Sequence, residues 1–408
     1  MSGAPGQFTG FNAELLRRNR FCMGVKRGRE YVCSGEAGED AVNKAVDFLV
    51  EAINRIQHWR VWETWWIEET MDEWLEARDR LEVQLRGKYS EDIVNAITGL
   101  VDKFINYNER FLNYWRDVGN ETRRLIDNLM NGRAEVIIRG EGASGISVHS
   151  EHITLETDRT STSIPVHLVL KGLEGVDVEV PDFMMMMNKE EYTKFVKTLR
   201  SLRIGFAETD ESVEKGRPVM GTNQTWQVIF WSLLYPGEIR VHINTVNVNV
   251  NNMTVTWYLR SSNHKSLKGK IKDADVDKFS DEEVLALTLT AVLGDGSAYV
   301  SKNTIKIGIT MSGEKFEAWE PLLQKLKKIG FDWGKPALNN DGTVNVWFRG
   351  SRAIDLARTT IGILPPILRD VLDALGFEKW LRINEYLRRS SSSGEVRRRL
   401  WWPVMGSR

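Results

Sequence analysis

The residue best placed for chemistry in this sequence is Asp295, which stands between Gly294 and Gly296 directly after an apolar segment. A carboxylate offers the oxygen ligands that Mg²⁺ prefers, and bound Mg²⁺ can activate water. The alternative is an aspartate in a turn that accepts hydrogen bonds from its own backbone. One carboxylate does not make a two-metal site, so catalysis requires a second acidic residue.

The residues before Asp295 predict a helix with a clear start. Ser280 and Glu283 form a Ser-x-x-Glu capping box, and the segment 284–293 is apolar on nearly every side. Such a helix is buried on several sides, and small side chains let a second helix approach closely. The residues expected to serve this packing or to end the helix are Thr288, Thr290, Ala291, Gly294 and Gly296.

Periodicity predicts the elements that follow this helix. Strands are expected over 298–300 and 304–310, an amphipathic helix over 316–329, two strands between 334 and 348, and helices over 354–387. The predicted order is therefore helix, strand, strand, helix, strand, strand, helix.

This order, with Thr290-Ala-Val-Leu-Gly-Asp-Gly296 closing its first helix, resembles the LAGLIDADG homing-endonuclease family, of the archaeal paralogous-repeat type. The resemblance implies an α+β fold in which two motif helices pack together and each delivers one carboxylate at its C-terminal end. It also implies double-stranded DNA as partner, Asp295 as a catalytic ligand of Mg²⁺, and an endonuclease activity. The family usually has Gly where this chain has Thr290, which implies a wider helix crossing here.

The resemblance further implies that DNA lies on a saddle of strands. Alternation places Lys306 on the face opposite Ile305 and Ile307. The alternative is that the basic residues of these strands are simply solvated. The expected phosphate contacts are Lys302, Lys306, Lys335, Arg349, Arg352 and, from the middle of the chain, Arg217.

An internal repeat is predicted upstream of this domain. The matching segments are 199–206 with 323–331, 216–218 with 334–336, and 227–232 with 345–351. In the upstream copy, Glu174 is the candidate for the second catalytic carboxylate. If that copy has lost its site, catalysis requires a homodimer through Asp295, and otherwise the protein binds DNA without cutting it.

Patterning divides the chain into six segments. They are a flexible basic leader (1–36), a helical hairpin or coiled coil (37–132), a degenerate β-rich repeat (133–264), a linker (265–279), the LAGLIDADG-like domain (280–388) and a basic tail (389–408). Within the repeat, strands are expected around 136–138, 146–149, 153–155, 166–170, 226–231, 239–243 and 246–250. The tryptophans between 59 and 74 stand among acidic residues, which favours a helix–helix core or a dimer seam over stacking on bases.

Charge and cysteine content narrow the class of protein. The whole chain has a net charge of −1, but residues 260–408 carry 25 Lys+Arg against 18 Asp+Glu, which favours a local site for a polyanion. The two cysteines, Cys22 and Cys33, are too few for a zinc site and are expected to be reduced, in a cytoplasmic protein. No apolar run is long enough for a transmembrane helix. The class that competes with a DNA-binding protein is an assembly protein built on the helical hairpin.

Overall fold

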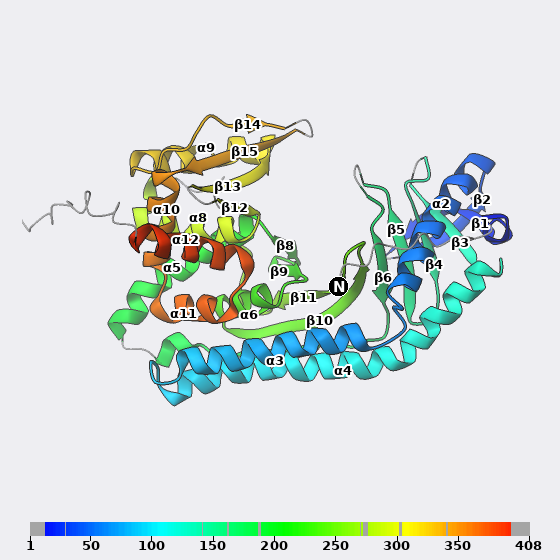
Figure 1. Ribbon diagram of the computed structural model, residues 1–408, viewed down its shortest axis with the longest axis horizontal. Coiled ribbons are helices and arrows are strands. Elements are labelled where there is room, and N and C mark those ends of the chain that lie inside the picture. The colour runs from blue at the N-terminus through cyan, green and yellow to red at the C-terminus, as the bar shows by residue number, and fades with distance from the viewer. Residues whose placement is uncertain are drawn as a thin grey trace, which may run out of the picture. The chain divides into compact units, whose positions relative to one another are not determined.

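The computed structural model describes residues 13–28, 30–140, 142–160, 163–186, 189–269, 271, 276–301, 304–339 and 342–392 (Figure 1). The fold is mixed α+β and has two compact units. Unit 1 comprises Met1–Leu75, Asp102–Asp177 and Arg240–Leu259, and unit 2 comprises Glu76–Val101, Val178–Ile239 and Arg260–Arg408. None of the helices in the described part of the chain is both long and apolar enough to cross a membrane.

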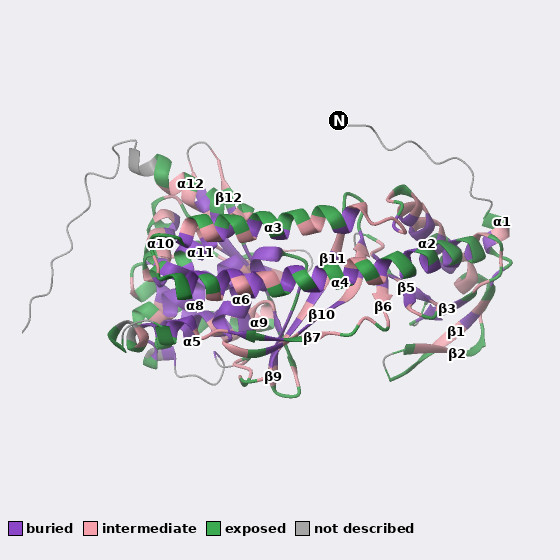
Figure 2. Cartoon of the chain, turned by 90° about the horizontal axis from the view of Figure 1, so that it is seen from below, coloured by how far each residue is buried: buried purple, intermediate pink, exposed green. Residues whose placement is uncertain are grey.

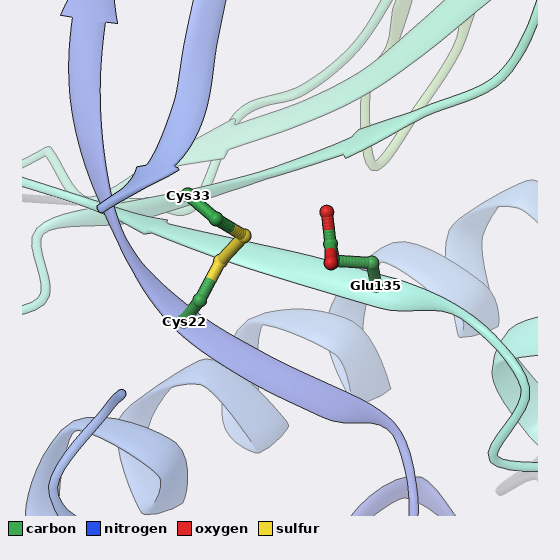
Figure 3. A group of neighbouring side chains, drawn as sticks. All are labelled: Cys22, Cys33 and Glu135. Atoms are coloured by element: carbon green, nitrogen blue, oxygen red, sulfur yellow. A yellow bond between two sulfur atoms is a disulfide. The ribbon is translucent and has the colours of Figure 1, made fainter. Parts of the chain in front are cut away.

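The first described segment of unit 1 is a short helix followed by a strand hairpin, at residues assigned to a flexible leader from the sequence. Helix α1 spans Ala13–Leu16, and strands β1 (Arg20–Arg27) and β2 (Glu30–Glu36) pair antiparallel. A disulfide joins Cys22 to Cys33 across this hairpin, with their Cα atoms 5.5 Å apart (Figure 3). The expectation of two reduced cysteines is therefore wrong for this structure, because the hairpin brings together residues that are 11 positions apart.

Three helices follow, as the periodicity predicts: α2 (Glu39–His58), α3 (Trp65–Leu85) and α4 (Glu91–Met130). The apolar seam of α4 is buried along the helix, while its other side is exposed (Figure 2). Within unit 1, the ring of Trp66 lies edge-on to the rings of Phe111 and Trp115, and Trp74 packs against Trp257. Of the tryptophans between 59 and 74, Trp66 and Trp74 therefore belong to the core.

The sheet of unit 1 has the strand order β2-β1-β3-β4-β5-β6-β10-β11. Strand β1 runs parallel to β3, and the pairs from β3 through β6 to β10 are antiparallel. Four strands lie close to where the alternation placed them. Their bounds are β3 (Glu135–Arg139), β4 (Gly145–His149), β5 (Ile153–Asp158) and β6 (Val166–Leu170). Strands β10 (Gly237–Val248) and β11 (Met253–Ser261) follow in the sheet, which continues through β9 and β8.

Between β6 and β10 the chain passes into unit 2. The elements there are β7 (Val176–Val180), a 3-10 turn η1 (Phe183–Met186), α5 (Lys189–Glu208), β8 (Glu211–Glu214), β9 (Arg217–Thr222) and α6 (Thr225–Leu234). The strand expected over 226–231 is in fact helix α6, and all of its residues are buried. A short apolar run fits a buried strand and a buried helix equally well, so its pattern could not distinguish them.

The last part of unit 2 has the expected order of elements. After η2 (Val276–Lys278) come α8 (Asp281–Leu293), β12 (Gly296–Val300), β13 (Ile305–Ser312), α9 (Gly313–Lys328), β14 (Ala337–Leu338), β15 (Thr343–Arg349), α10 (Ser351–Ile363), α11 (Pro366–Leu375) and α12 (Glu378–Ser392). The strand order is β12-β13-β15-β14, all antiparallel. The buried faces of β13 and β15 pack with α8, α9 and α10 in one hydrophobic core.

The same order of helices and strands occurs twice between Lys189 and Arg349. Elements α5-β8-β9-α6-β10-β11 repeat, in order, the elements α8-β12-β13-α9-β14-β15. In this order α5 takes the place of α8, while the repeat expected over 133–264 stays a prediction. The match of 199–206 with 323–331 paired α5 with α9 instead, because both helices end in Ile-Gly-Phe.

Candidate functional site

Helices α5 and α8 pack along one another in unit 2. The capping box predicted at the start of α8 is present: the Ser280 hydroxyl accepts from the amide of Glu283, and its amide donates to the Glu283 carboxylate. All residues of α8 from Val284 to Leu293 are buried, as the purple ribbon in Figure 2 shows. A helix that is apolar all round is thus enclosed by α5 and by the core of its own half.

The two helices are in close contact at Gly205 and Thr290. A Cβ atom built on Gly205 would lie 2.0 Å from Thr290 Oγ1 and 2.4 Å from the carbonyl oxygen of Leu287, so only glycine fits. The Thr290 hydroxyl donates to the carbonyl of Leu202 at 2.8 Å. The wider crossing expected from Thr290 is therefore absent, because the partner helix supplies the glycine and accepts a hydrogen bond.

The alignment of Gly205 on α5 with Thr290 on α8 also brings two aspartates together. Asp210 follows Gly205 by five residues, as Asp295 follows Thr290. A Cβ atom built on Gly294 would lie 1.8 Å from Asp210 Oδ2, so the Asp210 carboxylate rests on the backbone next to Asp295. Burial raises the pKa of Asp210, and the negative charge of Asp295 raises it further. Each helix of the pair thus delivers one carboxylate to a shared site.

Asp210, and not Glu174, occupies the place expected of the second carboxylate. Glu174 is exposed between β6 and β7, in unit 1, and no paired helix ends there. The sequence does carry a signal for Asp210, namely an acidic residue five positions after a small residue in a helix. The incorrect alignment of α5 with α9 concealed it.

Two ammonium groups lie at this carboxylate pair. Lys315 Nζ forms an ion pair with Asp295 Oδ2 at 3.0 Å. Lys379 Nζ donates to the carbonyls of Val292, Leu293 and Gly294 at 3.0, 2.7 and 2.8 Å. Burial lowers the pKa of the Lys379 ammonium to about 8, while the charges of Asp210 and Asp295 act in the opposite direction. Two carboxyl groups and two amino groups therefore share this site.

The two lysines affect whether this site can hold the Mg²⁺ that the resemblance implies. Carboxylate and carbonyl oxygens are suitable ligands, but Lys315 already holds Asp295, and Lys379 holds the carbonyls that end α8. Among the described residues, no third His, Cys, Asp or Glu joins the two aspartates in a potential metal-ligand group. The residues present therefore do not fit a divalent ion while Lys379 is in place.

The described residues contain one such group of three, Cys22, Cys33 and Glu135 in unit 1 (Figure 3). Its two sulfurs are bonded to each other. Cysteine binds zinc as a thiolate, so in the disulfide form neither sulfur is available as a ligand.

A second feature of unit 2 is the face of the β12–β15 sheet that points away from the core. Lys306 stands opposite Tyr299 on β12 and opposite Arg349 on β15, so the three side chains form a row across three strands. The Lys306 ammonium lies 5.7 Å from the centre of the Tyr299 ring, which is 56% exposed. Two cations and an aromatic ring thus share one accessible face.

An indole ring and a group of polar side chains continue this face along the sheet. The indole of Trp347 lies over Gly308, where a Cβ atom would come within 2.6 Å of the ring. Further along, the Thr310 hydroxyl donates to Asn345 Oδ1, and the Asn345 amide donates to Asn339. The opposite face carries Ile305, Ile307, Val346 and other core residues, so the alternation predicted for Lys306 holds.

The other expected phosphate contacts are dispersed. Lys335 is exposed in the segment before β14. Arg352 is on α10 and pairs with Asp332 at 2.9 Å, and Arg217 is on β9, where it donates to the carbonyl of His264. Lys302 lies outside the described residues. Of the expected set, Lys306 and Arg349 are therefore the pair that the sheet brings together.

A buried acid follows directly after Asp210. Glu211 is 2% exposed and accepts hydrogen bonds on Oε1 from Trp231 Nε1 (2.6 Å) and Tyr235 Oη (2.7 Å). Its other oxygen, Oε2, has no partner among the described residues. Burial raises the pKa of Glu211 to about 7, and the two hydrogen bonds oppose this rise. The raised pKa of Glu211 results from its burial in the fold, and the sequence pattern did not indicate it.

No family model matches the sequence, and no curated protein matches it. Among solved structures, the chain is similar to the homing endonuclease I-WcaI bound to its DNA recognition sequence. The identity is 13%, the TM-score is 0.29, and the similarity covers 48% of this chain and 92% of that chain.

Proposed function

We propose that this protein binds duplex DNA through the exposed face of the β12–β15 sheet in unit 2. The observation that carries the proposal is the row of Tyr299, Lys306 and Arg349 across neighbouring strands, on the face opposite the core. Cations spaced along a sheet neutralise successive phosphates, and an aromatic ring beside them contributes contact area. The excess of basic residues from 260 onward favours electrostatic attraction of DNA phosphates to this part of the chain.

We further propose that α5 and α8 are the paired helices of two LAGLIDADG-type half-domains within one chain. The repeated element order supports this assignment, as do the glycine contact at Gly205 and the aspartate at the end of each helix. Since both helices come from the same chain, this pairing does not need a homodimer.

Cleavage is the second candidate function, and the meeting of Asp210 with Asp295 is the observation that favours it. The ammonium groups of Lys315 and Lys379 oppose it, because the first already pairs with Asp295 and the second already donates to the carbonyls that would hold Mg²⁺. We therefore assign DNA binding without cleavage as the function of the chain.

Binding is tested by fluorescence anisotropy of a labelled 30-base-pair duplex, titrated at several salt concentrations. Lys306→Ala and Arg349→Ala are each expected to weaken binding and to reduce the slope of log K against log salt by about 0.9, the effect of one lost phosphate contact. Lys328→Ala is the matched control, since this exposed lysine is on α9, which covers the opposite face.

Two results would contradict the proposal. One is binding that does not depend on salt, and the other is an equal effect of the Lys328 and Lys306 variants. Incubation of wild-type protein and Asp295→Ala with supercoiled plasmid, in Mg²⁺ or EDTA, tests for endonuclease activity. Nicking that requires both Mg²⁺ and Asp295 would restore the endonuclease assignment.

A further inference from the structure

The amine of Lys379 has an unusual set of neighbours. Lys379 is in the first turn of α12, and its ammonium donates three hydrogen bonds, to the carbonyls of Val292, Leu293 and Gly294. An ammonium group has three N–H donors and no acceptor, so its hydrogen-bonding capacity is fully used. Its partners are consecutive carbonyls at the end of α8, where the helix dipole gathers partial negative charge.

The same amine also lies within electrostatic reach of both aspartates. The charges of Asp210 and Asp295 each favour the charged form of Lys379, and the charge of Lys379 in turn favours the ionised form of Asp210. Carbonyl oxygens with two carboxylates nearby are the surroundings that proteins build for hard cations. In this chain, a side chain of α12 provides the cation.

We propose that the Lys379 ammonium is the resident cation of the paired-aspartate site, replacing a divalent metal ion and holding the end of α8 beside Asp210. This assignment rests on the proposed pairing of α5 with α8 as motif helices. Lys379 is thus a positioning residue, and the α8 carbonyls become available to a metal ion only when its charge is removed.

The test is a gain of metal binding, measured with Mn²⁺ as the probe by calorimetry and by the loss of the free-ion electron paramagnetic resonance signal. Wild-type protein is expected to bind no stoichiometric Mn²⁺ at this site. Lys379→Met removes the charge and keeps a long side chain. It is expected to bind one Mn²⁺ with an affinity at least about tenfold above the nonspecific Mn²⁺ binding of wild type, because one cation–cation repulsion is removed. Adding Asp210→Asn is expected to abolish the gain.

Two further variants separate charge from packing. Lys379→Arg keeps the positive charge and is expected to bind Mn²⁺ no better than wild type. Lys325→Met is the matched control, because the Lys325 ammonium also donates to backbone carbonyls, those of Val276 and Phe279. It is expected to give no gain, and circular dichroism verifies that each variant is folded.

The proposal is overturned if Lys379→Met folds and gains no Mn²⁺ binding, or if Lys325→Met gains as much. It is equally overturned if wild-type protein binds one Mn²⁺ tightly and Asp210→Asn abolishes this binding, a result that does not depend on any lysine variant folding. Anisotropy with duplex DNA on the same samples reports on the proposed function separately, so a failure of DNA binding leaves the metal result interpretable.

Discussion

The buried carboxyl group of Glu211 predicts a pH-dependent stability that one substitution removes. In the folded protein, burial raises the pKa of Glu211 from its ordinary value of 4.5 to about 7. The unfolded chain therefore ionises this group at a lower pH than the folded chain does. The stabilisation is fully present below pH 4.5 and is lost as the pH rises through about 7.

The size of the effect follows from the shift. Each pKa unit corresponds to about 1.4 kcal/mol, so a rise from 4.5 to about 7 corresponds to a loss of about 3 kcal/mol in the free energy of unfolding between pH 4.5 and pH 8.5. No discount for solvent screening is needed, because Glu211 is 2% exposed. Glu211→Gln does not ionise, so its unfolding free energy lacks this contribution.

The assay is urea unfolding of wild type and Glu211→Gln at pH 4.5 and pH 8.5, followed by tryptophan fluorescence. Relative to wild type, the glutamine variant is expected to gain about 3 kcal/mol between the two pH values, whatever the constant effect of its amide. Glu238→Gln, at an exposed position, is the control and is expected to show a difference of well under 1 kcal/mol. An equal difference between wild type and Glu211→Gln at both pH values would refute the reasoning.

Two packing predictions concern the cores of the two units. Gly205→Ala places a methyl group 2.0 Å from Thr290 Oγ1 and is expected to cost about 1–3 kcal/mol in urea unfolding. Gly221→Ala, with open space around it, is the control, and equal costs would contradict the close helix crossing. In unit 1, Trp74→Ala is expected to cost about 3–5 kcal/mol. Trp74→Phe should cost much less, because among the described residues the indole N–H of Trp74 has no hydrogen-bond acceptor to lose. Equal losses of stability for the two Trp74 variants would show that Trp74 does not stabilise the protein through the packing of its ring.

Local patterns in the sequence were sufficient to predict the helices and strands that depend on a few neighbouring residues. The capping box at Ser280, the apolar run behind it and the alternation around Lys306 predicted the helix, its start and the exposed face of the strand. Helical spacing also predicted α4, because one residue in three or four must be apolar along a buried seam. These signals are set by the geometry of a single helix or strand.

The tertiary structure decided everything that depends on which segments meet. The disulfide partner of Cys22, the helical state of residues 225–234 and the contact of Gly205 with Thr290 all arise from contacts between segments. Nothing in the pattern around Lys379 indicated a role, because its partners are backbone carbonyls far away along the chain.

Asp295 shows the division most clearly. The sequence by itself determined that this carboxylate follows the end of a capped, buried helix, because caps, glycines and apolar spacing act over a few residues. Only the tertiary packing decided that Asp210 is its neighbour, that Lys315 of α9 pairs with it and that Lys379 of α12 donates to the carbonyls beside it. Electrostatic balance depends on distances in space, and those are set by the tertiary fold.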